Sequence, residues 1–387
     1  MSNRRLPLYF TLSAFAISAN AVPPLLSTMS AELALPAWTL GAGITIQYIS
    51  FSAIAWLGGM ISARRGITHR TMIVSGLLVL SLALLLAPYV TASLVAVLIW
   101  MGVLGFSGGS VETFASISLT EDSPSASSKS LCISQAFFAL GAFVAPQVAS
   151  FFLGRLGGWK SVFLVLGGLA SAVTLFFLVF GRRRARPPSS ATAAGTELAK
   201  DVVSPSGGLT VSYFRILLFT YVLVETLLAS WIPFMLENQR NFSVRNAASA
   251  ASFFWFGMIF GRIAIVVLPN RLTLWPALTV SSLSAVAASI ALPLFPDSSR
   301  LLLFAFGFMM GPIWPIVVRI AIATLRSDAL ATSVLAAGGL GAAAGPFLGS
   351  VLLAGGFAHV YFQVVIGIVV VVASLVIFAL VKRRRMA

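Results

Sequence analysis

Long apolar runs follow one another along almost the whole chain, and they constrain the fold more than any other feature. A transmembrane α-helix takes roughly 20 consecutive apolar residues, and each of these runs reaches that length. Short strands with alternating polarity are missing, which argues against an outer-membrane barrel. The sequence therefore predicts an all-α integral membrane protein with twelve transmembrane helices. The predicted helices cover residues 8–30, 40–62, 71–90, 92–118, 129–153, 160–181, 212–236, 246–268, 273–295, 300–322, 329–355 and 360–381.

The composition agrees with this prediction. Hydrophobic residues make up 59% of the 387 residues and charged residues only 9%, whereas soluble domains carry about 25% charged residues. The net charge is +15, and with both termini in the cytoplasm twenty of the 25 basic residues fall in cytoplasmic segments. This is the positive-inside bias. The basic residues therefore indicate topology in a cell inner (plasma) membrane and contact with membrane lipids, not a nucleic-acid partner.

A segment rich in Arg, Pro, Ser, Ala and Gly, residues 182–208, interrupts the apolar runs in the middle of the chain. Such a composition is typical of a linker. The predicted organisation is therefore a six-helix bundle at 1–181, a cytoplasmic linker at 182–211 and a second six-helix bundle at 212–387. A monomer of 40.8 kDa is sufficient for this architecture.

The two halves also repeat each other at nearly constant spacing. The matching pairs are Tyr9-Phe10 with Tyr213-Phe214, Gly105-Phe106 with Gly307-Phe308, and Gly141 to Pro146 with Gly341 to Pro346. An even number of helices in each half gives parallel repeats related by an axis along the membrane normal, with a central cavity between them. Small residues let helices approach closely in lipid, and a proline inside a helix bends it. Pro146 and Pro346 are therefore candidates for conformational change.

The twelve runs, the repeat and the basic linker together resemble the major facilitator superfamily. The loop GGMISARRGITHR after the second run is similar to the cytoplasmic signature of that family, because Gly59, Arg64, Gly66 and Arg70 fit its pattern. The resemblance implies a gating role for these four residues. Ala63 stands where the family has an acidic residue, so the charge relay of that loop is incomplete here.

A narrower resemblance lies inside the membrane. The stretches GFSGGSVETFAS, SQAFFALGA and TYVLVETLLASW are similar to motifs of fucose permease and related sugar:proton symporters. The resemblance implies that Glu112, in the first stretch, takes part in proton coupling. In fucose permease an aspartate of the first helix acts with this glutamate, and the matching position here is Asn20, an amide that cannot titrate. Glu112 then carries the coupling alone or with Glu225, or transport is uncoupled.

Both glutamates also stand out without any resemblance. They lie deep inside apolar runs, whereas the other eight acidic residues fall in linkers or near helix ends. A carboxyl group at membrane depth must be protonated, paired or hydrated, so it marks a functional site by default. The structural alternative is a permanently protonated glutamate that joins two helices by a hydrogen bond. Loss of hydration disfavours the charged form, which gives such a group the means to pick up and release protons.

Amides and aromatic rings complete the predicted substrate site. Its candidate residues are Asn20, Gln47, Gln135, Glu225, Trp231 and Trp314. Gln47 and Gln135 are equally explained as bridges between helices. Interface anchoring is the alternative for the two tryptophans, and it is stronger for Trp231, near a helix end. Arg262 and Arg319 lie near predicted cytoplasmic helix ends, where a long side chain reaches water by snorkelling.

Several kinds of chemistry find no support in the sequence. No His, Cys or acidic cluster has metal-ligand spacing, GFSGGS lacks the ending of a phosphate loop, and no Ser-His-Asp set shares one depth. We therefore expect no cofactor and no enzymatic activity. The sequence favours a secondary active transporter that moves a small polar solute, sugar or sugar-like, by alternating access with protons as the coupling ion. The alternatives are an exporter of amphipathic or cationic compounds or lipids, and a membrane sensor or scaffold that does not transport.

Overall fold

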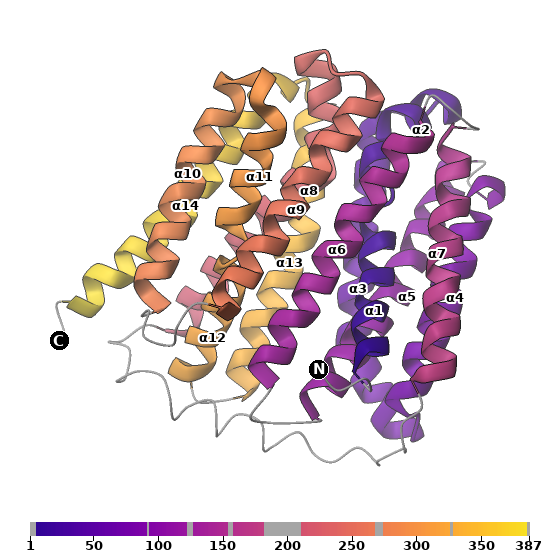
Figure 1. The fold of residues 1–387 in the computed structure, drawn as a ribbon, viewed down its shortest axis with the longest axis horizontal. Coiled ribbons are helices and arrows are strands. Elements are labelled where there is room, and N and C mark those ends of the chain that lie inside the picture. The colour runs from indigo at the N-terminus through magenta and orange to yellow at the C-terminus, as the bar shows by residue number, and fades with distance from the viewer. Residues whose placement is uncertain are drawn as a thin grey trace.

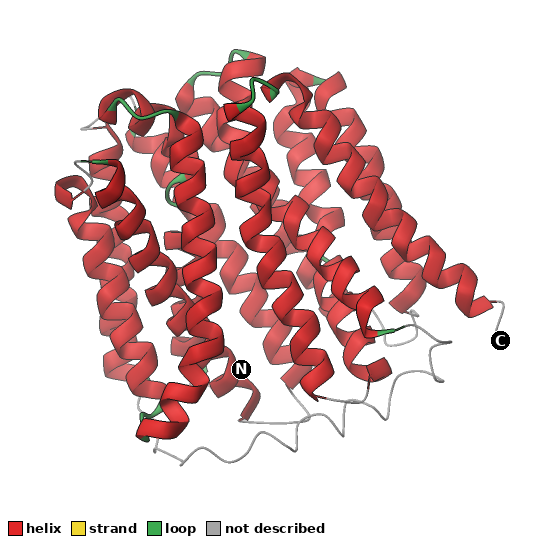
Figure 2. Ribbon diagram, turned by 180° about the vertical axis from the view of Figure 1, so that it is seen from behind, coloured by secondary structure: helices red, strands yellow, loops and turns green. Residues whose placement is uncertain are grey.

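The computed structural model describes residues 5–90, 93–121, 127–153, 158–181, 210–267, 274–325 and 328–384. Within these ranges the chain is helical with short connections, and no strand occurs among them (Figures 1 and 2). The helices are α1 (Leu6–Ala19), η1 (Pro23–Leu25), α2 (Leu26–Leu33), α3 (Ala37–Arg65), α4 (His69–Val90), α5 (Leu94–Glu121), α6 (Ser127–Phe152), α7 (Gly158–Phe180), α8 (Val211–Arg240), α9 (Val244–Val267), α10 (Leu274–Leu294), η3 (Pro296–Ser298), α11 (Ser299–Met310), α12 (Ile313–Leu325), α13 (Asp328–Ala354), η4 (Ala358–Val360) and α14 (Tyr361–Arg384).

These helices correspond to the twelve predicted membrane crossings, and the all-α class is confirmed. Among the described residues, eleven helical runs are long and apolar enough to cross a membrane. The remaining crossing, α3, is 29 residues long, which at 1.5 Å per residue exceeds the hydrocarbon thickness. Most of the predicted linker, residues 182–209, lies outside the described residues.

Most packing among the crossings falls within the set α1 to α7 or within the set α8 to α14, and we call these two sets the first and the second bundle. The bundles meet along two helix pairs, α3 with α13 and α6 with α9, and η1 also reaches across to α8 and α9. Figure 1 shows α6 and α9 side by side, with the N-terminal end of the described chain and the C-terminus at the same end of the molecule. The helix α2 lies at the opposite end, which we call the α2 end.

Glycines at matching places in the two halves permit matching contacts. A Cβ atom at any of them would collide with the backbone of a neighbouring helix. The colliding pairs are Gly105 with Gln47, Gly109 with Phe51, Gly307 with Phe254 and Gly311 with Met258. In each half the glycines and their partners are both spaced by four residues, about one helical turn. The pseudo-symmetry expected from the repeated sequence is therefore present in the packing of α5 on α3 and of α11 on α9.

Two of the crossings are broken. The first consists of α1, η1 and α2, and Asn20 ends α1 by donating from Nδ2 to the carbonyl of Ala16 at 2.9 Å. The prolines Pro23 and Pro24 follow, and they lack the N–H groups needed to continue the ladder. The tenth crossing breaks between α11 and α12, just before Pro312. Irregular backbone at membrane depth is tolerated where protein surrounds it or where it lines a water-filled space.

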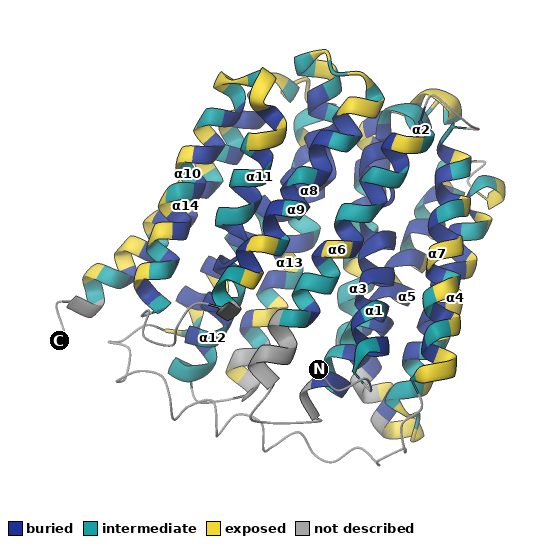
Figure 3. Cartoon of the chain, in the orientation of Figure 1, coloured by how far each residue is buried: buried dark blue, intermediate teal, exposed yellow. Residues whose placement is uncertain are grey.

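The burial pattern agrees with a lipid environment. Exposed residues concentrate on the outward faces of the helices, as the yellow segments in Figure 3 show. Many of the exposed residues are large and apolar, including Ile99, Leu175, Val280, Leu301 and Phe378. One buried apolar cluster runs through the second bundle and into the part of the first bundle nearest the α2 end. A separate cluster fills the other half of the first bundle. The two bundles are therefore joined most tightly at the α2 end.

Candidate functional site

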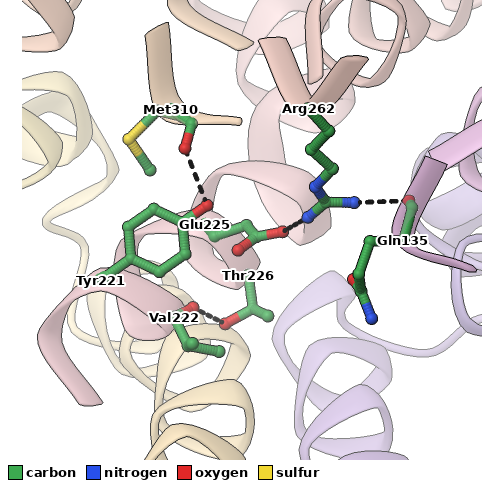
Figure 4. A network of polar contacts seen from close by, with 7 residues as sticks. All are labelled: Gln135, Tyr221, Val222, Glu225, Thr226, Arg262 and Met310. Atoms are coloured by element: carbon green, nitrogen blue, oxygen red, sulfur yellow. Dashed lines mark hydrogen bonds and ion pairs between the residues drawn. The ribbon is translucent and has the colours of Figure 1, made fainter. Parts of the chain in front are cut away.

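A buried arginine marks the place where the two bundles meet at mid-depth. Arg262 of α9 is only 3% exposed. Its Nη1 donates to the backbone carbonyl of Gln135 on α6 at 2.9 Å, and its Nη2 lies 3.5 Å from Oε1 of Glu225 on α8 (Figure 4). The Nε atom is buried without a hydrogen-bond partner. Arg262 therefore links α9 to its own bundle and to the facing one.

This position corrects the prediction that Arg262 reaches water by snorkelling. The side chain points into the protein, toward a carboxylate and a backbone carbonyl, and water is excluded from it. A charge costs several kcal/mol to bury alone, so the pairing with Glu225 is the physical reason that it can stay there. Arg319 of α12 is partly buried, and its Nε also lacks a partner.

Glu225 supplies the carboxylate that pairs with Arg262. The residue is 7% exposed, on the face of α8 that looks toward α9. Its contact to Arg262 is single and long, whereas a full fork between arginine and carboxylate makes two bonds near 2.7–2.9 Å. The pair therefore neutralises its charges without saturating the donors of the guanidinium group.

Tyr221 lies one helical turn before Glu225 on the same face of α8. Its hydroxyl donates to the backbone carbonyl of Met310 at 3.1 Å (Figure 4), and it lies beside both Glu225 and Arg262. Met310 ends α11, where the chain breaks and carbonyl groups lose their helical partners. Tyr221 thus ties the broken crossing to the charged pair.

Glu112 lies in the same electrostatic neighbourhood on the opposite bundle. It lies near Arg262 of α9, and Tyr48 of α3 lies near both Glu112 and Glu225. Within the described part of the chain Glu112 has no hydrogen-bond or ion-pair partner, and its side chain is half-buried. The structure thus brings the two predicted glutamates to one region, with one of them paired and the other not.

The predicted amides take three different positions. Gln47 is buried on α3, where Nε2 donates to the carbonyl of Ser18 at 3.2 Å while Oε1 has no partner. Asn20 is buried and ends α1, as described above. Gln135 contributes its backbone carbonyl to Arg262, and its side chain is half-buried beside that contact (Figure 4). Gln47 and Gln135 lie on α3 and α6, which contact the second bundle, and Asn20 lies at the break in the first crossing.

The two predicted tryptophans differ in burial. Trp231 of α8 is fully buried toward the α2 end and donates from Nε1 to the carbonyl of Pro346 on α13 at 3.1 Å. A Cβ atom on Gly41 of α3 or on Gly349 of α13 would collide with its ring. Trp231 therefore fills the contact between the bundles. Trp314 is half-buried in α12, just after the break in the tenth crossing.

The predicted gating residues lie at the end of the molecule opposite the α2 end. Gly59 is part of α3, and Arg64 is exposed in the last turn of that helix. Gly66 follows with a φ of 63°, a left-handed conformation that favours glycine. Arg70 of α4 donates to the carbonyl of Leu178 on α7 at 3.3 Å. This loop connects helices within the first bundle.

Pro146 and Pro346 are buried inside α6 and α13, which are two of the four helices that join the bundles. Among the described residues, no group of three or more His, Cys, Asp or Glu lies close enough to hold a metal ion. The candidate site therefore consists of one guanidinium group, two carboxyl groups and the hydroxyl groups of tyrosines.

These features define a membrane transport protein, and comparison with known proteins places it in a family. The model of the Major Facilitator Superfamily matches residues 8–337, and the chain belongs to that superfamily. Its members are multi-pass membrane transporters and not enzymes.

Individual relatives share about a quarter of their aligned residues with this chain. The TsgA homologue of Citrobacter koseri is 26% identical over 282 residues, covering 73% of this chain and 68% of the relative. TsgA of Escherichia coli O157:H7 is 24% identical over 282 residues with the same coverage.

Two solved structures share the fold. The human organic anion transporter MFSD10 has a TM-score of 0.67 at 15% identity, with 97% of this chain and 100% of the other covered. A bacterial homologue of the human lysosomal transporter Spinster, in an inward-facing and occupied conformation, has a TM-score of 0.69 at 16% identity, with 97% and 96% covered. At such identities the likeness concerns the fold alone.

Proposed function

We propose that the protein is a secondary active transporter that moves a small polar solute by alternating access, with proton coupling through Glu112. One observation carries the proposal: Glu112 is half-buried and unpaired in the region where Arg262 and Glu225 already neutralise each other. A carboxyl group that is surrounded by protein and has no counter-charge of its own changes its protonation when its hydration changes.

The mechanism follows from the two-bundle architecture. The termini and the linker lie in the cytoplasm in this proposal, so the tightly packed α2 end faces the other side. Rocking of the bundles about α3, α6, α9 and α13 exposes Glu112 to each side in turn. A proton binds on the side of high proton concentration and leaves on the other, and the substrate binds the same region in one protonation state. A monomer carries all of these groups.

The test is uptake into proteoliposomes, with a panel of neutral sugars, sugar acids and lipophilic cations, with and without an inward proton gradient. We expect gradient-driven accumulation of a polar solute by the wild-type protein. Glu112→Gln should abolish accumulation but retain exchange of substrate across the membrane, because an amide cannot carry the proton. Full accumulation by that variant would refute coupling at Glu112.

Asp297→Asn is the matched control, because Asp297 is exposed in η3 and distant in sequence from every residue of the site. It should transport like the wild-type protein. A second candidate, export of amphipathic cations, is favoured by the presence of two carboxyl groups and one guanidinium group, and the same panel would detect it. Movement of no solute at all by folded protein would favour a sensor.

A further inference from the structure

The guanidinium group of Arg262 has more donors than the protein fills. A guanidinium group carries five N–H donors in a fixed fork. The carbonyl of Gln135 and, at the long distance of 3.5 Å, Oε1 of Glu225 accept from two of them, and the hydroxyl of Tyr221 also lies beside the group. Nε is buried with no partner. A buried N–H donor of a charged group that has no acceptor costs free energy. The unpaired Nε therefore indicates that a ligand supplies an acceptor at this position.

The geometry of the unpaired N–H groups indicates which kind of ligand group would bind them. The N–H groups of a guanidinium match the two oxygens of a carboxylate, which accepts two parallel hydrogen bonds. Glu225 occupies only one of the donors and does so loosely. A carboxylate from a ligand could take Nε together with an Nη atom, which Glu225 does not do in this structure.

Resting on the proposed function, we infer that the transported solute carries a carboxylate, that Arg262 binds this carboxylate by a two-point contact, and that Glu225 holds the place until the solute arrives. In the absence of solute, Arg262 pairs with Glu225, and the carboxylate of the solute replaces Glu225 as the partner of Arg262. This assigns a substrate class, small organic acids, within the small polar solutes of the proposed function.

Charge balance adds a consequence. Arg262 and Glu225 are neutral as a pair, and an added carboxylate leaves the site with one excess negative charge. A proton must therefore bind with each solute, and Glu112, the carboxyl group that has no counter-charge of its own, is the group that carries it. The other charged or titratable groups near this position are Glu225 and Tyr221 of α8, Tyr48 of α3 and the guanidinium of Arg262 itself. Substrate and proton are then taken up one to one.

The test is direct binding to the purified protein in detergent, by calorimetry and by thermal stabilisation. The probes are glucuronate, gluconate and lactate, each compared with a neutral counterpart: glucose, sorbitol and lactamide. We expect at least one acid to bind and its counterpart not to bind. The Kd of the wild-type protein should rise about tenfold for each unit of pH as one proton accompanies each acid.

Variants separate the binding role of Arg262 from a structural one. Glu225→Gln should bind the acid more tightly and with a weaker pH dependence, because no carboxylate has to be displaced. The double variant Arg262→Gln/Glu225→Gln leaves no unpaired buried charge, so it should fold, yet it should lose at least about 30-fold in affinity for the acid. Arg262→Lys should give an intermediate affinity because it keeps the charge and loses the fork.

Arg215→Gln is the control. Arg215 is an exposed arginine of α8 whose Nε donates to Ser333 at 3.1 Å, and its loss should leave binding unchanged. Binding of glucose, sorbitol or lactamide as tightly as of its acid, binding of none of the three acids, or binding that survives in the double variant would each overturn the inference. None of these binding outcomes tests the proposed function, which the uptake assay tests separately. If the acid binds normally but no solute is transported, the proposed function is overturned and the inference about Arg262 stands.

Discussion

A single hydrogen bond between the bundles provides a quantitative test of the closed α2 end. Nε2 of Gln147 on α6 donates to Oγ of Ser252 on α9 at 2.6 Å, and Ser252 is fully buried. Ser252→Ala removes the acceptor and leaves the amide of Gln147 unpaired at the interface. A net hydrogen bond contributes about 0.5–1.5 kcal/mol, so a loss of about 1 kcal/mol should shift the ratio of closed to open molecules roughly fivefold toward open.

The assay is a distance distribution between spin labels at the α2 end, in a background in which Cys132 is replaced by Ser. Trp38 at the start of α3 and Phe357 after α13 are both exposed and belong to different bundles, so cysteines there would report the separation. Ser252→Ala should increase the population at long distance. Ser282→Ala is the matched control, because buried Ser282 bonds only within α10, to Leu278 at 2.8 Å. An unchanged distribution in Ser252→Ala, or an equal shift in the control, would refute the reasoning.

Three further variants test the packing and the site. Gly341→Ala should destabilise the fold by about 1–3 kcal/mol, because the added Cβ would meet the backbone of α8. Gly367→Ala is its control and should be neutral, because the space around Gly367 is open. Thermal unfolding in detergent measures both variants. Trp231→Phe should also shift the spin-label distances toward open, since a smaller ring loses part of the contact with α3 of the facing bundle at Gly41; an unchanged distribution would contradict this role. Tyr221→Phe should lower thermal stability by about 1–3 kcal/mol through the unpaired carbonyl of Met310, and a variant as stable as the wild-type protein would show that the carbonyl finds another partner.

The fold was largely predictable from the sequence because its main determinants are local. Crossing a bilayer requires long apolar runs, and those runs are visible without any tertiary information. The repeat was visible because close helix contacts require glycine at fixed places, as at Gly105 and Gly307. The breaks within the first and tenth crossings were not predicted, although Pro23, Pro24 and Pro312 stand at them. A proline inside an apolar run indicates a bend equally well, and only the surrounding helices decide between a bend and a break.

The site was predictable only in part. The glutamates stood out because a carboxyl group at membrane depth is rare, and the structure brings Glu112 and Glu225 to one region. Arg262 was missed as a member of the site, because an arginine near a helix end is normally explained by snorkelling. Which way its side chain turns depends on Glu225, 37 residues away in sequence, and on a backbone carbonyl of the facing bundle. The signal that could have found it was the need of a buried Glu225 for a cationic partner.

Coupling of solute movement to proton movement in this site is what makes the proposed transporter a secondary active one. The most direct measurement is the number of protons that enter proteoliposomes with each molecule of solute, followed with a pH-sensitive dye inside the vesicles and with labelled solute in parallel. We expect one proton for each solute molecule in the wild-type protein and no solute-dependent proton entry in Glu112→Gln. Solute uptake by the wild-type protein without any proton entry would contradict it.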